Sequence, residues 1–206
     1  MKVTRYESAL PDGYRLVYSI DFKERRIALR FGVIGIAILA VTMLLCSLRL
    51  VGQPLRNFAL SGAEFYIGYA VFFAAMVVYL VLHELTHGLF YKIFTGRKLT
   101  FGISLSCAYC GVPDVYLYRP YALIGALAPF VIFSGVFLGL LVYTYFLHPM
   151  AYLAAAFMLG MHLSGCLGDL YIAYLLLKMR TPALLMRDTG ASQFFYLPTD
   201  KETSVC

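Results

Sequence analysis

Three titratable residues stand within five positions of one another inside an apolar stretch. Residues 83–87 read H-E-L-T-H and lie near the end of a run, residues 65–94, that is hydrophobic on all sides. Histidines four positions apart lie on one face of a helix, so His83 and His87 can hold one metal ion between them. Glu84 projects about 100° further round the helix. It is therefore close enough to take a proton from a water molecule at that ion, as metal-dependent hydrolysis requires.

A structural interpretation of the same residues is also open. Two buried histidines can hydrogen-bond to neighbouring helices, and one of them can neutralise Glu84. An ionisable side chain at the centre of a bilayer costs about 3 kcal/mol or more, which favours a functional reason for keeping three of them together. We favour the metal site because the structural interpretation leaves Glu84 without a role.

The composition predicts an integral membrane protein. Of 206 residues, 61% are hydrophobic and 14% are charged, and the mean hydropathy is +0.77. A soluble domain of this size could not bury so much apolar surface, whereas a small helical membrane protein exposes it to lipid. We expect one domain over residues 1–206 in a bacterial plasma membrane. The net charge of +6 needs no nucleic-acid partner, because membrane topology accounts for it.

Four apolar segments are long enough to span, so the predicted fold class is an all-α polytopic membrane protein with four transmembrane helices. They are residues 31–51, 64–94, 121–147 and 150–177. The first thirty residues are polar and charged, which predicts no cleavable signal peptide. Seven basic residues lie in residues 1–30, four in residues 92–119 and four in the tail 178–206. Only Arg49 and Arg56 lie on the other side, so both termini are expected in the cytoplasm.

The spacing of hydrophobic residues changes to every second position between the second and third helices, which predicts a short β-hairpin at the membrane surface. Hydrophobic residues alternate strictly with small or polar ones over residues 99–107, which is typical of a strand. Residues 111–114 read as a turn and residues 115–118 as the returning strand. A re-entrant loop is the alternative.

Two further segments carry weaker signals. Residues 14–22 partly alternate, which fits a short strand or amphipathic piece as well as an unstructured basic tail. Residues 194–197 read F-F-Y-L in an otherwise polar tail, and we expect them on the bilayer surface.

A catalytic zinc site needs a third protein ligand besides the two histidines. Apart from Glu64 at a helix edge, Glu84 and Asp169 are the only carboxylates in the four predicted spans, so Asp169 is the candidate. His162 is the rival, although it lies two turns from Asp169, about 10.5 Å along a straight helix, too far to share one ion easily. A buried ion pair at Asp169 and an interhelical hydrogen bond at His162 are the structural alternatives.

Depth supports Asp169. His87 and Asp169 lie seven and eight residues from the cytoplasmic ends of their predicted helices, which is about 11 or 12 Å. Pro129, eight residues into the third helix, reaches the same level. Its missing N–H frees the carbonyl of Gly125, a polar group that must face protein or water.

The five cysteines form no paired framework. Cys107 and Cys110 make one C-x-x-C, whereas a structural zinc site of that type needs a second pair. We interpret them as reduced thiols, with a redox or metal role as the alternative.

These residues resemble a known family. His83, Glu84 and His87, together with G-C-L-G-D at residues 165–169 and A-L-A-P at residues 126–129, are similar to the site-2 protease class of intramembrane zinc metalloproteases. They more closely resemble a family of small membrane proteins described as putative zincin peptidases, over residues 64–177.

The resemblance implies zinc held by His83, His87 and Asp169, with Glu84 as the general base. Site-2 proteases carry Asn-Pro before the aspartate and Gly after it, whereas here Leu167 and Gly168 precede Asp169 and Leu170 follows it.

The predicted function is that of a zinc metalloendopeptidase that hydrolyses peptide bonds in or near the membrane. Its partners would be the lipid bilayer and a membrane-protein or peptide substrate. The substrate would pair as an added strand with the edge of the hairpin. One alternative is a zinc-binding membrane protein without peptidase activity, acting as a sensor, partner subunit or transporter. Another is a structural four-helix protein, which binds no metal.

Overall fold

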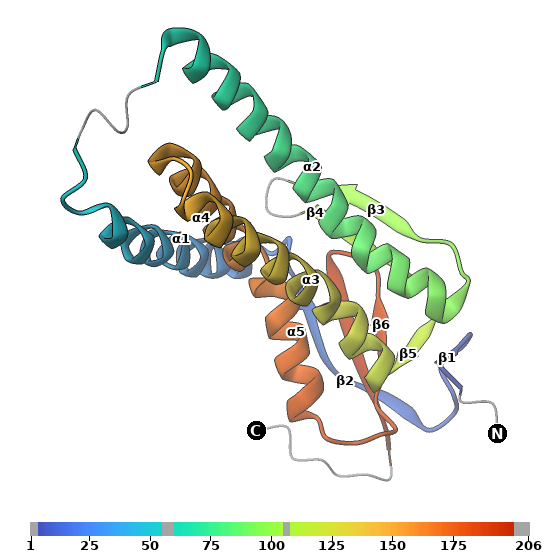
Figure 1. The fold of residues 1–206 in the computed structure, drawn as a ribbon. Coiled ribbons are helices and arrows are strands. Elements are labelled where there is room, and N and C mark those ends of the chain that lie inside the picture. Colours follow the sequence, from blue (N-terminus) through green and yellow to red (C-terminus); the bar gives the residue numbers. More distant parts are fainter. Residues whose placement is uncertain (1–3, 55–59, 105–107, 200–206) are drawn as a thin grey trace. The chain divides into compact units, whose positions relative to one another are not determined.

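The structure is a computed structural model that describes residues 4–54, 60–104 and 108–199 (Figure 1). Its helices are α1 (Arg25–Ser47), the short 3-10 helix η1 (Leu48–Leu50), α2 (Gly62–Thr95), α3 (Arg119–Tyr145), α4 (Pro149–Gly165) and α5 (Leu167–Lys178). Its strands are β1 (Tyr6–Glu7), β2 (Tyr14–Asp21), β3 (Thr100–Ile103), β4 (Ala108–Gly111), β5 (Tyr116–Tyr118), β6 (Leu185–Asp188) and β7 (Ser192–Pro198).

The chain forms two compact units. The sheet unit comprises Met1–Arg30, Glu84–Pro129 and Gly168–Cys206, and the helical unit comprises Phe31–His83 and Phe130–Leu167. Helix α2 is continuous and contributes to both, because the division falls between His83 and Glu84.

Each predicted apolar segment forms helix. Arg25–Leu50, Gly62–Thr95 and Arg119–Tyr145 are long and apolar enough to cross a membrane by length and composition. The fourth segment differs from the prediction of one helix, because Pro149–Gly165 and Leu167–Lys178 are bent by 43° at Cys166. The pair makes a fourth span if it crosses as one unit.

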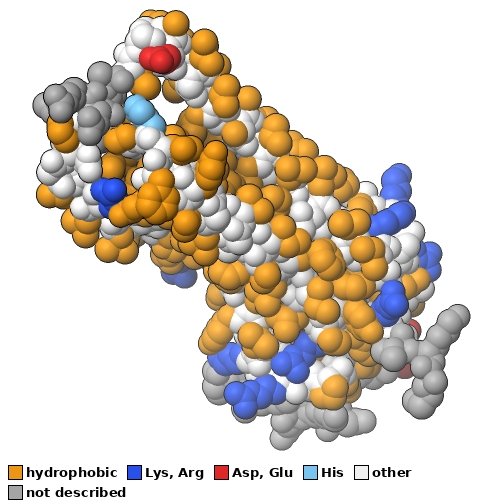
Figure 2. Space-filling view, in the orientation of Figure 1, with side chains coloured by type: hydrophobic (Ala, Val, Ile, Leu, Met, Phe, Trp, Pro, Cys, Tyr) orange, Lys and Arg blue, Asp and Glu red, His pale blue; other side chains and the backbone are white. Residues whose placement is uncertain are grey.

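The apolar helices expose much of their hydrophobic surface, and Figure 2 shows such side chains over the visible faces of the molecule. Lipid is a favourable environment for a face of this kind, so the arrangement is compatible with a membrane protein. Along α2 the exposed large side chains include Phe65, Tyr66, Ile67, Tyr69, Val71, Phe73, Val77 and Val78.

Helix α2, which carries the motif, has defined ends. At its start Ser61 N–H donates to Glu64 Oε2 (2.8 Å) and Glu64 N–H donates to Ser61 Oγ (3.2 Å), a reciprocal capping box. At its end Gly96 adopts a positive φ of 66° and its N–H donates to the Lys92 carbonyl, as a terminating glycine does.

A five-stranded antiparallel sheet corrects the all-α prediction. Its strand order is β1-β5-β6-β7-β2, so it joins the amino-terminal segment, the connection between α2 and α3, and the carboxyl-terminal segment. In β2 and β7, Tyr14 pairs with Pro198 and Asp21 with Ser192. The sheet could not be predicted from local pattern because three of its four strand pairings, β1–β5, β5–β6 and β2–β7, join segments far apart in the sequence.

Helix α5 packs against this sheet (Figure 1). Ile172, Leu175 and Leu176 of α5 lie in one buried cluster with Leu117 of β5 and Phe195 of β7. This core fixes the helix that carries Asp169.

The predicted hairpin between α2 and α3 exists, but with a different second strand. Strand β3 pairs antiparallel with β4, Thr100 opposite Gly111 and Ile103 opposite Ala108. Residues 115–118, expected to return along residues 99–107, instead form β5 between β1 and β6. The predicted strand residues 105–107 lie outside the described residues.

The two weaker signals resolve into strands of the larger sheet. Residues 14–21 form β2, as one of the interpretations predicted. Residues 194–197, expected on the bilayer surface, belong to β7, where Phe195 and Leu197 are buried.

Candidate metal centre

The backbone of α3 orients His87. The Nδ1 atom of His87 lies 2.8 Å from the carbonyl oxygen of Gly125. Pro129, four residues further along α3, has no N–H to occupy that carbonyl, so it is available to a side chain. Because a carbonyl oxygen can only accept, Nδ1 of His87 carries a hydrogen, and in the neutral ring Nε2 is the nitrogen with the lone pair.

Asp169 faces that lone pair from the first turn of α5. Its Oδ1 atom lies 3.4 Å from Nε2 of His87. With the hydrogen on Nδ1, both facing atoms are acceptors and repel one another unless a second proton or a cation lies between them. Both residues belong to the sheet unit.

This separation fits two ligands of one zinc ion. A tetrahedral ion with bonds of about 2.0–2.1 Å holds its nitrogen and oxygen ligands about 3.3–3.4 Å apart. A neutral hydrogen bond between the same atoms is usually about 2.7–3.2 Å long. The partly buried carboxylate, the oriented imidazole and their 3.4 Å spacing therefore suit zinc.

His83 and Glu84 lie on the same continuous helix as His87. His83 is one turn before it, so the two imidazoles project from one face of α2. Glu84 is three residues before His87, which makes it a neighbour on the helix surface. The Tyr79 hydroxyl lies 3.3 Å from His83 Nδ1, and the Phe133 ring stacks on the His83 ring.

A buried acid supports His87 from the sheet. The ring of Tyr91 stacks on His87, and its hydroxyl donates to Asp188 Oδ2 in β6 (2.6 Å). Burial raises the pKa of Asp188 from 3.8 to about 6, although hydrogen bonds from Tyr91, Gly190 and Gln193 oppose the rise. This network ties α2 to the sheet next to the candidate ligand.

The small hairpin packs against α2 beside His87. A Cβ atom on Gly88 would lie 3.0 Å from Phe101, 3.1 Å from Leu99 and 3.3 Å from Cys110. Glycine therefore allows β3 and β4 to approach the helix one residue from the candidate ligand.

A family model described as putative zincin peptidase matches residues 76–184, which is more than half of the chain. The chain belongs to this putative zincin peptidase family. The family indicates a metallopeptidase and implies zinc. No curated protein matches, and no solved structure matches.

The part that matches the putative zincin peptidase family contains the candidate ligands, Glu84 and Gly125. His83, Glu84, His87, Gly125 and Asp169 all lie within residues 76–184. The match therefore covers α3, α5, the hairpin and the part of α2 that carries these side chains.

His162, the rival third ligand, lies in a different group of side chains. Its Nδ1 is 2.9 Å from the Tyr79 hydroxyl and 3.5 Å from Cys166 Sγ, and its Nε2 is 3.0 Å from Ser134 Oγ. The straight-helix estimate of its distance from Asp169 does not apply, because the helix is broken at Cys166.

Two partners of the candidate site were missed from sequence. Tyr91 and Asp188 are joined across 97 positions, which no local pattern signals. The break at Cys166 had a weak signal, since small residues crowd around it at positions 160, 164, 165 and 168.

The C-x-x-C pair is only partly described. Burial raises the pKa of Cys110 to about 12, so this thiol stays protonated at neutral pH. Cys107 lies outside the described residues, and the prediction of reduced thiols stays a prediction.

Proposed function

We propose that this chain is a membrane-embedded zinc metalloendopeptidase, with His83, His87 and Asp169 as the zinc ligands and Glu84 as the general base. The observation that carries the proposal is the arrangement of His87, whose Nδ1 is engaged by Gly125 and whose Nε2 faces Asp169 at 3.4 Å. Membership of the zincin family supports the reaction class.

The position of His83 on α2 supports its role as a ligand. His83 and His87 are one turn apart on α2, which is the spacing by which two imidazoles reach one ion. Together with Asp169 they make a two-histidine, one-carboxylate set, which leaves the fourth position of a catalytic zinc open.

Zinc, when bound there, would supply Lewis-acid chemistry. It would polarise a peptide carbonyl and lower the pKa of a water molecule to about 7. A carboxylate oxygen of Glu84 takes the proton of the attacking water and later donates it to the leaving amine nitrogen. The Gly125 carbonyl keeps His87 in the tautomer that presents Nε2, and Asp188 holds the Tyr91 ring against His87.

The hairpin offers a place for an extended substrate. Within the described residues β3 pairs only with β4, so the other edge of β3 is available to an added strand. Strand β3 contacts α2 at Gly88, next to His87, which supports delivery of a peptide to the site.

Insertion in a bacterial plasma membrane with both termini in the cytoplasm is part of the proposal. The five-stranded sheet joins segments from both ends of the chain and from the connection between α2 and α3, so the three belong on one side of any membrane the helices cross. Those are the segments in which basic residues gather, which supports the cytoplasmic side. The likeness of the G-C-L-G-D segment to the site-2 proteases supports a relationship to that class.

The test separates zinc binding from proton transfer. Purified wild type, Glu84→Gln and the control Glu24→Gln, an exposed carboxylate in the sheet unit, are assayed for zinc content and for cleavage of synthetic transmembrane peptides by mass spectrometry. We expect Glu84→Gln to keep zinc and to lose about 10²- to 10⁴-fold in cleavage rate, as removal of a general base does.

Two results would overturn the assignment. Cleavage by Glu84→Gln at the wild-type rate would remove Glu84 from the mechanism. Zinc in the wild type without cleavage of any peptide would favour the alternative of a zinc-binding membrane protein without peptidase activity.

A further inference from the structure

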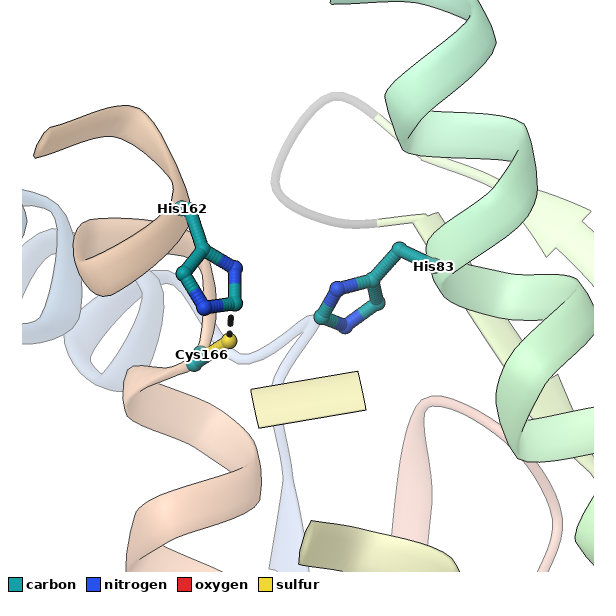
Figure 3. A group of neighbouring side chains, drawn as sticks. All are labelled: His83, His162 and Cys166. Atoms are coloured by element: carbon teal, nitrogen blue, oxygen red, sulfur yellow. Dashed lines mark hydrogen bonds between the residues drawn. The ribbon is translucent and has the colours of Figure 1, made fainter. Parts of the chain in front are cut away.

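A second group of metal-binding side chains lies within the helical unit. His83 of α2, His162 of α4 and Cys166, at the break after α4, each offer one ligand atom, and these atoms all lie within 4.8 Å of one another. All three residues are buried, and Figure 3 shows the two imidazoles and the sulfur turned toward one another.

The spacing of sulfur and nitrogen in this group matches one coordinated ion. Cys166 Sγ lies 3.5 Å from His162 Nδ1, since the two residues are one turn apart. A tetrahedral zinc with Zn–N of about 2.0–2.1 Å and Zn–S of about 2.3 Å holds these two ligands about 3.5 Å apart.

The polar atoms around His162 exceed what a hydrogen-bonded histidine needs. A neutral imidazole uses one partner at each nitrogen. Ser134 Oγ already lies 3.0 Å from Nε2, whereas both the Tyr79 hydroxyl and the Cys166 thiol converge on Nδ1, at 2.9 and 3.5 Å. The Tyr79 hydroxyl also reaches His83 Nδ1 at 3.3 Å, so it contacts a ring nitrogen of both histidines.

Aromatic rings enclose the group. Phe130 stacks on His162, and Phe133 and Phe137 lie with ring centroids 6.3 and 5.5 Å from it. An apolar shell of this kind limits water access and strengthens the field that an ion feels.

The donor set selects the class of ion. Two imidazoles and one thiolate, without a carboxylate, suit thiophilic cations such as zinc and disfavour magnesium and calcium, which prefer oxygen ligands. The thiolate also supplies the one negative charge that a cation in an apolar site requires.

We propose that His83, His162 and Cys166 form a second metal site, which binds a thiophilic divalent cation of the zinc class. This site goes beyond the proposed peptidase function, because it uses neither Glu84, His87 nor Asp169. The two proposed sites have only His83 in common, so an ion at the second site engages a residue of the first.

Cobalt(II) tests the proposal directly, because cobalt bound by a thiolate has a near-ultraviolet charge-transfer band that cobalt bound by nitrogen and oxygen lacks. The full-length protein in detergent is titrated with cobalt as wild type, Cys166→Ser and Cys110→Ser. Cys110 is a matched control, being a buried thiol of the sheet unit. We expect the band in the wild type and in Cys110→Ser, and its loss in Cys166→Ser.

Two further variants separate this site from the proposed peptidase site. His162→Ala should weaken the cobalt affinity read from the band by at least about 10-fold. Even removal of a group that only hydrogen-bonds to a metal ligand costs that much. His87→Ala should keep the band, because His87 is not in the set.

The outcomes distinguish the two proposals. A wild type without the thiolate band, or a band undiminished in Cys166→Ser, would overturn the second site and leave the first intact. Unchanged total zinc in His87→Ala, with the thiolate band present, would count against the peptidase site alone.

Discussion

His87 and His162 are both buried histidines with partners at both ring nitrogens, yet their partners differ in kind. His87 contacts a backbone carbonyl and a carboxylate, groups that can only accept when the carboxylate is ionised. His162 contacts two hydroxyls and a thiol, which can either donate or accept.

The difference teaches how a fold sets the chemistry of an imidazole. At His87 the Gly125 carbonyl fixes the hydrogen on Nδ1, so Nε2 faces Asp169 as a base that requires a positive charge between them. At His162 the hydroxyl and thiol partners can adapt to either tautomer. A ligand from the first group is therefore oriented in advance, whereas a metal at the second must displace a hydrogen from Cys166.

The largest expected effect tests the acidic partner, which His87 has and the His162 group lacks. Asp169→Ala removes a proposed ligand and should lower zinc affinity by more than about 100-fold. That is the largest loss usually seen when a group that only hydrogen-bonds to a metal ligand is removed. The measurement is zinc content per chain after dialysis, with Asp114→Ala as the control carboxylate in the sheet unit. Equal zinc in both variants would reduce the His87–Asp169 contact to an ion pair.

A pH dependence tests the support behind His87. The pKa of Asp188 rises from 3.8 to about 6 on folding, so the folded state binds this proton more tightly than the unfolded state does. The contribution of Asp188 to the free energy of unfolding is most favourable below about pH 4. It declines by about 3 kcal/mol as the pH rises through 6.

Thermal unfolding of wild type and Asp188→Asn in detergent, between pH 4 and pH 7, measures this contribution. The wild type should lose stability relative to the variant as the pH rises, because only the carboxyl group ionises. Parallel curves for the two proteins would contradict the raised pKa.

The orientation of His87 is tested at the proline. Pro129→Ala restores an N–H that competes with His87 for the Gly125 carbonyl, and zinc affinity should fall by about 10-fold. Pro120→Ala, in the first turn of the same helix, is the matched control. Competition titrations with a zinc chelator give both affinities, and a greater loss in the control would refute the role of the freed carbonyl.

The smallest expected effect sharpens the other side of the comparison. Ser134→Ala removes one hydroxyl from His162 Nε2 and should lower the free energy of unfolding by about 1 kcal/mol, the usual value of one hydrogen bond. Ser47→Ala, which removes an exposed hydroxyl bonded to its own helix, should cost less. Unfolding midpoints in detergent check both, and a loss at Ser134 no greater than at Ser47 would mean that the bond is dispensable.

Several features of the fold and the site could be predicted because they depend on local spacing or hydropathy. The four apolar segments become helices, and Thr100–Ile103, part of the strict alternation predicted over residues 99–107, becomes β3. The carbonyl that Pro129 frees is the one that His87 contacts, because the missing N–H is a covalent property of proline.

Other features were missed because they depend on pairing between distant segments. Strand β5 follows the hairpin in sequence but pairs with β1 and β6, where Leu117 joins a buried cluster with Phe195 and Leu176. The F-F-Y-L segment looked like a membrane-surface anchor, yet its alternate residues Phe195 and Leu197 face that core. The sequence of a short apolar run does not indicate which distant strand will pair with it.

The amino-acid sequence alone establishes the apolar helices, the one-turn spacing of His83 and His87, and the carbonyl freed by Pro129, since helical periodicity and covalent structure act over a few residues. Tertiary structure alone decides that Asp169 faces His87, that Tyr91 reaches Asp188 across 97 positions, and that the ligand atoms of His162 and Cys166 lie within 4.8 Å of that of His83. These contacts join segments remote in the chain, and only the packing of those segments brings their side chains within bonding distance.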